Sequence, residues 1–158
     1  MISVYIKSTK VTIIPLKMGL DIACGDLTLK VGSYENVEKI HYLLLVALKD
    51  YLEFETEDYD QKVDYLCEII KKENCIQYDK ISNRKNFLFW RDELDGFFPF
   101  IFDSELSTTM SDYEAKRFLQ TFDIVKDHVH HSLKFINEFY LSSVFQESID
   151  SGNEITFF

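Results

Sequence analysis

Three histidines and an aspartate stand close together in the segment Asp127-His128-Val129-His130-His131. Imidazole and carboxylate groups are the ligands that zinc and similar metals take from proteins. On a helix, residues three and four apart share a face, so Asp127, His128 and His131 could hold one metal ion. The same pattern fits a polar junction between two helices. A metal site and a structural junction therefore both stay open as interpretations.

The segment 18–34, MGLDIACGDLTLKVGSY, holds three of the five glycines of the chain. Its spacing matches neither the dinucleotide-binding fingerprint nor the P-loop, and we expect no cofactor. Gly32, Ser33 and Tyr34 precede an expected helix, whose N-terminal N–H groups and dipole favour an anion. These three residues are a candidate anion site, and a strand-to-helix turn is the alternative.

Cys24 lies in the same segment and could act as a nucleophile. A reactive cysteine needs a lowered pKa, which a nearby histidine such as His41 supplies. An enzyme built around Asp21, Cys24 and the histidines near position 130 is one hypothesis. The alternative is that Cys24 is a small buried side chain.

Acidic side chains accompany aromatic ones in two further stretches, 53–60 and 90–105. Aromatic anchors with a polar rim concentrate binding energy in protein interfaces. We therefore expect a partner-binding surface formed by Glu55, Glu57, Asp58, Trp90, Asp92, Asp95, Phe97, Asp103 and Glu105.

The chain of 158 residues has a net charge of −10. Nucleic acids and anionic membranes bind Lys- and Arg-rich surfaces, so neither is expected as a partner. A basic protein is the natural counterpart, although surplus charge also simply keeps a protein dispersed. The three cysteines cannot all pair within one chain. We expect them to be reduced and mostly buried, which predicts a cytoplasmic protein.

Alternating and helical apolar patterns define the elements that must position these residues. Val-, Ile- and Tyr-rich runs predict strands at 2–7, 11–16, 20–23 and 27–31. Apolar residues at helical spacing predict a helix from Ser33 to about Leu52 and another over 59–72.

In the second half, the apolar runs 86–90 and 97–103 are expected to be strands, with Pro99 bending the second. Ser111 and Glu114 form a capping-box pattern that opens a helix. A further helix is expected from about Leu133, stopped at Ser151-Gly152, before a final strand in EITFF.

This order predicts one α+β domain over residues 1–158. We expect an antiparallel or mixed sheet of about five to seven strands with about four helices packed on it.

Four short motifs resemble a group of small uncharacterised proteins: Met18–Gly25, Val31–Tyr34, Ser111–Lys116 and Gly152–Phe157. The resemblance implies a fold plan but no activity. It also implies that Met18 is an alternative start, with residues 1–17 an added strand segment. Where the group has an acidic loop with His, Cys and Gly, this chain has residues 103–109, DSELSTT.

Two classes of function remain. The first is a non-enzymatic acidic protein that occupies a basic partner, as immunity and inhibitor proteins do. The second is a protein that sequesters a small molecule or anion, or a metal-dependent enzyme that uses Asp127, His128 and His131.

Overall fold

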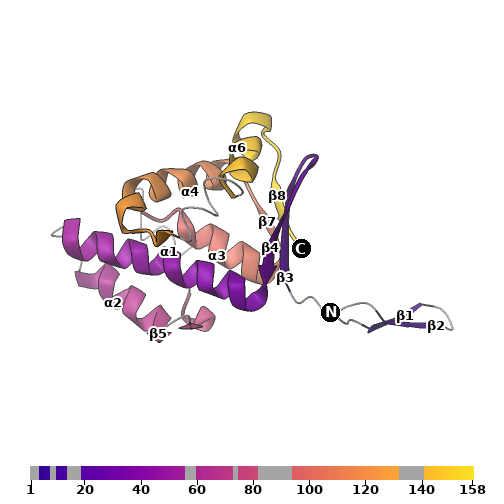
Figure 1. The fold of residues 1–158 in the computed structure, drawn as a ribbon, viewed down its shortest axis with the longest axis horizontal. Coiled ribbons are helices and arrows are strands. Elements are labelled where there is room, and N and C mark those ends of the chain that lie inside the picture. The colour runs from indigo at the N-terminus through magenta and orange to yellow at the C-terminus, as the bar shows by residue number, and fades with distance from the viewer. Residues whose placement is uncertain are drawn as a thin grey trace.

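The computed structural model describes residues 4–7, 10–13, 19–55, 60–72, 75–81, 94–131 and 141–158 (Figure 1). Strands are β1 (Val4–Lys7), β2 (Lys10–Ile13), β3 (Gly19–Cys24), β4 (Leu27–Ser33), β5 (Ile70–Lys72), β6 (Cys75–Ile76), β7 (Thr109–Met110) and β8 (Ile155–Phe157). Helices are α1 (Tyr34–Glu55), α2 (Asp60–Ile69), α3 (Phe97–Leu106), α4 (Asp112–Val125) and α6 (Ser142–Ser151), with 3₁₀ turns η1 (Tyr78–Lys80) and η3 (Lys126–His128).

An antiparallel sheet with the strand order β4-β3-β8-β7 forms one layer. Leu20, Ile22 and Cys24 alternate along β3 and are buried, while the residues between them are only partly covered. This period of two gives the sheet one core face. Figure 1 shows the helices gathered on one side of this sheet.

The α+β class is therefore confirmed, but the sheet is smaller than expected. Among the described strands, β1 and β2 pair only with each other, as do β5 and β6, so neither pair extends the four-stranded sheet. The expected strand at 86–90 lies outside the described residues. Five α-helices are present in the described part of the chain, against about four expected.

Helix α1 follows the predicted spacing, since Val37, Ile40, Leu44 and Leu48 are all buried. The Ser33 hydroxyl accepts the N–H of Asn36, as a capping serine does. The helix continues to Glu55, past Leu52, which is its last buried residue.

The apolar run 97–103 was expected to be a strand, and it is the start of α3. Pro99 stands in the first turn, where its missing N–H would have no helical partner anyway. A side chain at Gly96 would meet the Arg117 carbonyl oxygen at 2.2 Å, so glycine lets α3 begin against α4. The helical period then buries Phe97, Phe98 and Phe100 on the inner face.

These phenylalanines join rings from α4, α6 and β8 in the core. Phe118 lies 4.5 Å from Phe145 between ring centroids, and Phe100 lies 5.8 Å from Phe157, both edge to face. Edge-to-face pairs add about 0.5–1.5 kcal/mol beyond the area they bury. This aromatic cluster connects the last three helices to the sheet.

The C-terminal predictions are largely confirmed. Ser111 and Glu114 form the capping box of α4, with both reciprocal hydrogen bonds. Gly152 ends α6 with a φ of 76°, and β8 follows. Helix α2 is shorter than predicted, because residues 70–72 leave it to pair with β6. Of the helix expected from Leu133, residues 132–140 lie outside the described part.

Candidate functional site

A histidine lies in the core, because His41 on α1 has none of its surface exposed. Its Nδ1 is 2.8 Å from the Tyr78 hydroxyl, and its Nε2 is 2.8 Å from Ser104 Oγ. The Phe100 ring stands edge-on to the imidazole, 5.5 Å between centroids. Three elements, α1, η1 and α3, therefore meet at one side chain. We call Tyr78, His41 and Ser104 the His41 clamp.

One arrangement of protons gives every polar atom of the His41 clamp a partner. In this arrangement the Ser104 hydroxyl donates to the Ile101 carbonyl oxygen at 3.2 Å, which uses its only hydrogen. Ser104 Oγ then accepts from Nε2–H of His41. The bare Nδ1 accepts from the Tyr78 hydroxyl, so no polar atom of the clamp lacks a partner.

Burial sets the protonation of this clamp. It lowers the pKa of His41 from 6.5 to about 3, because the imidazolium would lose its hydration. Burial also raises the pKa of Tyr78 far above its ordinary value, and the charges of Glu105 and Glu38 add to the rise. Both groups are therefore neutral near pH 7.

The Ser104–His41 distance is that of a nucleophile and its general base. However, Ser104 is 1% exposed, so a substrate has no access to its hydroxyl. A general base works best with a pKa near the working pH, and a pKa of about 3 makes His41 a poor one. The arrangement acts as a structural link between three elements rather than as a catalytic pair.

A small cavity of about 80 Å³ adjoins the clamp at Tyr78. Small-molecule sites usually enclose about 300–1,000 Å³, so this cavity fits a single side chain instead. We call it the Tyr78 pocket, and it is lined by Tyr78, Ile81, Phe102, Glu105 and Leu106.

The surroundings of the Tyr78 pocket are acidic. Burial raises the pKa of Tyr34, and the charge of Glu105 raises it further. Tyr34 is 40% exposed and Leu106 is 56% exposed. The pocket itself combines apolar walls with one carboxylate, that of Glu105.

This setting argues against an anion site at residues 32–34. The Ser33 hydroxyl is engaged with the Asn36 N–H at 3.2 Å. The charge of Glu105, which raises the pKa of Tyr34, also disfavours an anion at this helix end. The strand-to-helix turn explains Gly32, whose φ is 125°.

The opposite end of α1 carries an exposed aromatic cluster. Phe54 is 75% exposed and stacks on His128, with 6.2 Å between centroids and 5° between planes. Tyr51 meets the same imidazole edge-on at 6.2 Å. Nε2 of His128 is 3.3 Å from Glu55 Oε1.

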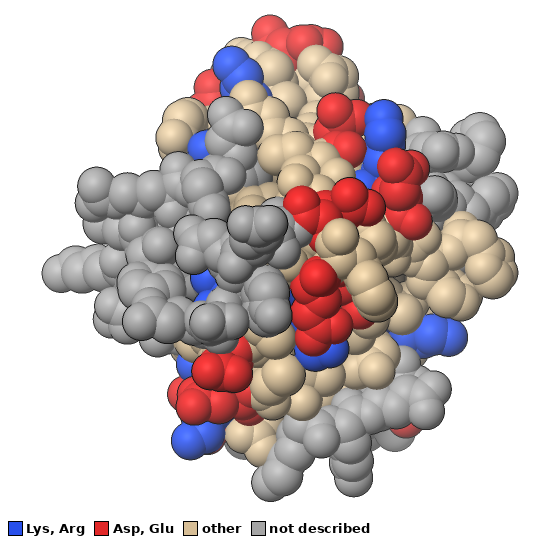
Figure 2. Space-filling view, turned by 90° about the vertical axis from the view of Figure 1, so that its left-hand side faces the viewer, with Lys and Arg blue, Asp and Glu red and all other residues tan. Residues whose placement is uncertain are grey.

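Further carboxylates belong to the same end of α1. Burial raises the pKa of Asp50, while the charges of Lys49 and His128 oppose the rise. Asp127 adjoins His128 and is exposed. Figure 2 shows acidic side chains gathered in the middle of the molecular face where α1 ends. We call this the α1-end face, formed by Asp50, Tyr51, Phe54, Glu55, Asp127 and His128.

Lys49 and Lys126, which precede Asp50 and Asp127 in the sequence, are each paired with a carboxylate. Lys49 Nζ lies 3.1 Å from Glu53 Oε1, and Lys126 Nζ lies 3.1 Å from Asp123 Oδ1. Each pair is neutral as a unit. The carboxylates of the α1-end face therefore keep its charge negative.

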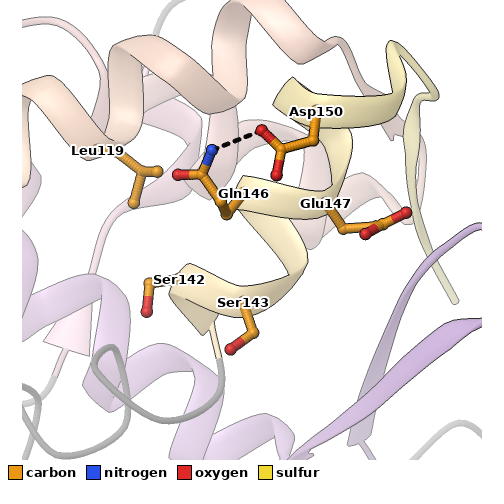
Figure 3. Close-up of a pocket in the computed structure, with 6 residues that line it drawn as sticks. All are labelled: Leu119, Ser142, Ser143, Gln146, Glu147 and Asp150. Atoms are coloured by element: carbon orange, nitrogen blue, oxygen red, sulfur yellow. Dashed lines mark hydrogen bonds between the residues drawn. The ribbon is translucent and has the colours of Figure 1, made fainter.

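A wider groove of about 420 Å³ lies along α6, next to Leu119 of α4 (Figure 3). Gln146 donates to Asp150 at 2.9 Å, while Glu147 points away from both Gln146 and Leu119. Ligand sites bring a few polar groups to one point. Because these side chains diverge, the groove is a weaker candidate than the two ends of α1.

The structure divides the predicted partner-binding residues. The prediction that Phe97 and Asp103 face a partner is wrong, because both side chains are buried. Phe97 lies in the aromatic core, and Asp103 accepts a hydrogen bond from the Thr108 hydroxyl at 2.9 Å. The cause is that α3 is helical where a strand was expected. Asp95 forms an ion pair with Arg117.

Two predicted members, Glu55 and Glu105, lie at different ends of α1, on the α1-end face and in the Tyr78 pocket. Glu57, Asp58, Trp90 and Asp92 lie outside the described residues.

The predicted metal set does not assemble. The chain leaves the helix at η3, and Val129 is extended, so Asp127, His128 and His131 do not share a helical face. His128 turns to Glu55, while His131 lies 4.2 Å from His130 between ring centroids. Among the described residues, no three His, Cys, Asp or Glu side chains are grouped as metal ligands.

Cys24 and His41 make separate contacts. Cys24 is buried on β3 and its thiol donates to the Asn153 carbonyl oxygen at 3.7 Å, whereas His41 bonds only to hydroxyls. Burial raises the pKa of the Cys24 thiol, the opposite of nucleophile activation. All three cysteines are free thiols, and Cys67 is exposed rather than buried as expected.

Sequence reasoning missed Tyr78, Ser104 and Phe54. Tyr78 stands in a polar stretch without periodicity, and Ser104 was expected in the loop that follows the predicted strand 97–103. Phe54 lies two residues beyond the predicted end of its helix, and extending the helical period past Leu52 was the signal that could have shown it.

No model of a known protein family, no curated protein and no solved structure matches this chain. Within the described residues, none of the helices has the length and apolar character needed to cross a membrane.

Proposed function

We propose that this protein is a non-enzymatic binding protein that occupies a basic protein partner, as immunity and inhibitor proteins do. The observation that carries the proposal is the α1-end face, where an exposed phenylalanine and a carboxylate both contact the imidazole of His128. Electrostatic complementarity speeds and orients the docking of such a face onto Lys and Arg side chains. A cytoplasmic setting belongs to the same proposal, because the free thiols suit a reducing compartment.

The chemistry of the face suits a cationic counterpart. The Phe54 ring can take a Lys or Arg head on its open side, since its other side is stacked on His128. Glu55, which lies beside His128, and the exposed Asp127 then add negative charge to the same face. Docking apolar and ionic groups together is typical of interface anchors.

The test uses fluorescein-labelled decalysine as the basic probe and fluorescence anisotropy as the readout. We expect saturable binding that weakens steeply as salt rises, because surface charges are screened. Glu55→Gln should weaken binding about two- to fivefold, which corresponds to about 0.5–1 kcal/mol. Phe54→Ala should cost a similar factor through the lost cation–π contact.

Glu147→Gln is the matched control, because it removes the same charge from an exposed position on α6. Equal weakening by Glu55→Gln and Glu147→Gln would show that decalysine senses only net charge, and the α1-end face would not be the site. Absence of binding at low salt would remove the proposal altogether.

A further inference from the structure

We propose that the Tyr78 pocket is a socket for one basic side chain, lysine or arginine, of a protein or peptide ligand. Such side chains have an apolar stem and a charged head, so they lie well in a pocket of mixed character. Ile81, Phe102 and Leu106 supply apolar wall for the stem, and Glu105 supplies a carboxylate for the head.

Size narrows the occupant to a side chain. A cavity of about 80 Å³ lies well below the range of sites that enclose whole small molecules. It is open to partners at its rim, where more than half of Leu106 is exposed. A single projecting side chain can therefore enter while the rest of its ligand stays outside.

Charge selects a cation over an uncharged aliphatic group. The carboxylates of Glu105 and Glu38 both act on the Tyr78 hydroxyl. Tyr78 and Phe102 also line the pocket, and aromatic rings attract a cation over their faces. A neutral stem such as norleucine would gain the apolar contact but neither electrostatic term.

The His41 clamp preorganises this pocket. Tyr78 is held through its hydroxyl by His41, which is itself held by Ser104, so the wall does not need to be ordered on binding. Preorganised walls reduce the entropy that binding costs. The hydrogen bonds of the His41 clamp therefore hold the Tyr78 ring in place as one wall of the pocket.

This socket is independent of the α1-end face. Tyr78 bonds α1 at His41, which lies about 20 Å from Phe54 along the helix at 1.5 Å per residue. One site can therefore fail without the other. The inference goes beyond the proposed function, because any ligand with an accessible basic side chain could use the socket.

The test is an NMR titration of the full chain with the N-acetyl, N-methylamide derivatives of lysine, arginine and norleucine. The methyl resonances of Ile81 and Leu106 report on the pocket. We expect saturable shifts with lysine or arginine, and about two- to fivefold weaker binding of norleucine, as one cation–π contact implies. Glu105→Gln should bring the cationic ligands close to norleucine, while Glu147→Gln should change nothing.

Three results would each overturn the proposal: no saturable shift at Ile81 or Leu106, equal binding of norleucine, or cation binding unchanged by Glu105→Gln. Phe54→Ala distinguishes a failure of this proposal from a failure of the proposed function. The variant should abolish none of these shifts, even where it weakens decalysine binding at the α1-end face.

Discussion

His41, in the first half of helix α1, and His128, which lies against the last turn of α1, have similar neighbours but different surroundings. Each imidazole meets two aromatic rings and bonds an oxygen. His41 is fully buried and bonds two hydroxyls, while His128 is partly exposed and meets the Glu55 carboxylate. Burial, more than the types of the neighbouring residues, therefore decides whether a polar cluster stabilises the fold or faces a partner.

The rings around the two histidines differ in the same way. Phe100 lies in the core beside His41, where its removal would open a cavity. Phe54 beside His128 leaves most of its surface exposed, so we expect it to contribute more to the binding of a partner than to the stability of the fold. One end of α1 is therefore expected to respond to mutation through stability, and the other through binding.

The largest expected effect is that of His41→Ala. It leaves a cavity and removes the partners of two buried hydroxyls, so the free energy of unfolding should fall by about 4 kcal/mol. His128→Ala should cost less than about 1 kcal/mol, because its site is partly solvated. Urea denaturation of both variants measures the difference. Similar losses at the two sites would remove the contrast between the ends of α1.

The second-largest expected effect is a loss of stability in acid through His41. Its pKa is about 3 in the folded chain and 6.5 when unfolded, so below pH 6.5 the unfolded state binds the extra proton. The free energy of unfolding should fall by about 3 kcal/mol between pH 7 and pH 4 through this group, with no further contribution above pH 7.

Urea denaturation at both pH values, on wild type and His41→Gln, isolates this loss, since the variant lacks the titrating imidazole. His131→Gln, at an exposed histidine, should keep the wild-type pH dependence. An identical pH dependence in wild type and His41→Gln would show that the buried imidazole is not the source.

A smaller effect is expected from Tyr78→Phe. The change removes the hydroxyl that donates to Nδ1 of His41 and leaves a buried acceptor without a donor, at a cost of about 1–2 kcal/mol. Tyr34→Phe, at a 40% exposed tyrosine, should change stability by less than about 0.5 kcal/mol. Thermal denaturation of the two variants compares them directly, and equal stabilities would mean that the clamp holds without Tyr78.

Local patterns were enough to predict much of the fold. The apolar spacing of Val37, Ile40 and Leu44 predicted α1, and the Ser111–Glu114 capping box predicted the start of α4. Both signals act within a few residues, where spacing alone fixes the geometry. Helix α3 was missed because its aromatic residues favour strands and Pro99 suggested a bend, while its packing on α4 decided otherwise.

The candidate sites were predictable only in part. Glu55 and His128 were both selected, but for different sites, because 73 positions separate them in the sequence. His41 lies 37 positions from Tyr78 and 63 from Ser104, so no local pattern joins the clamp. Contacts of this kind depend on how helices and turns pack, which a single sequence does not display.

The smallest expected effect concerns the Glu55–His128 pair itself. A double-mutant cycle with Glu55→Gln and His128→Gln should give a coupling energy below about 0.5 kcal/mol, since the Glu55 side chain is 55% exposed. The coupling should shrink further when salt is raised, because water and ions reach the pair. Urea denaturation of the wild type, both single variants and the double variant supplies the cycle. A coupling above about 2 kcal/mol that persists in high salt would mean that His128 is held as firmly as His41, and the α1-end face would then be part of the scaffold.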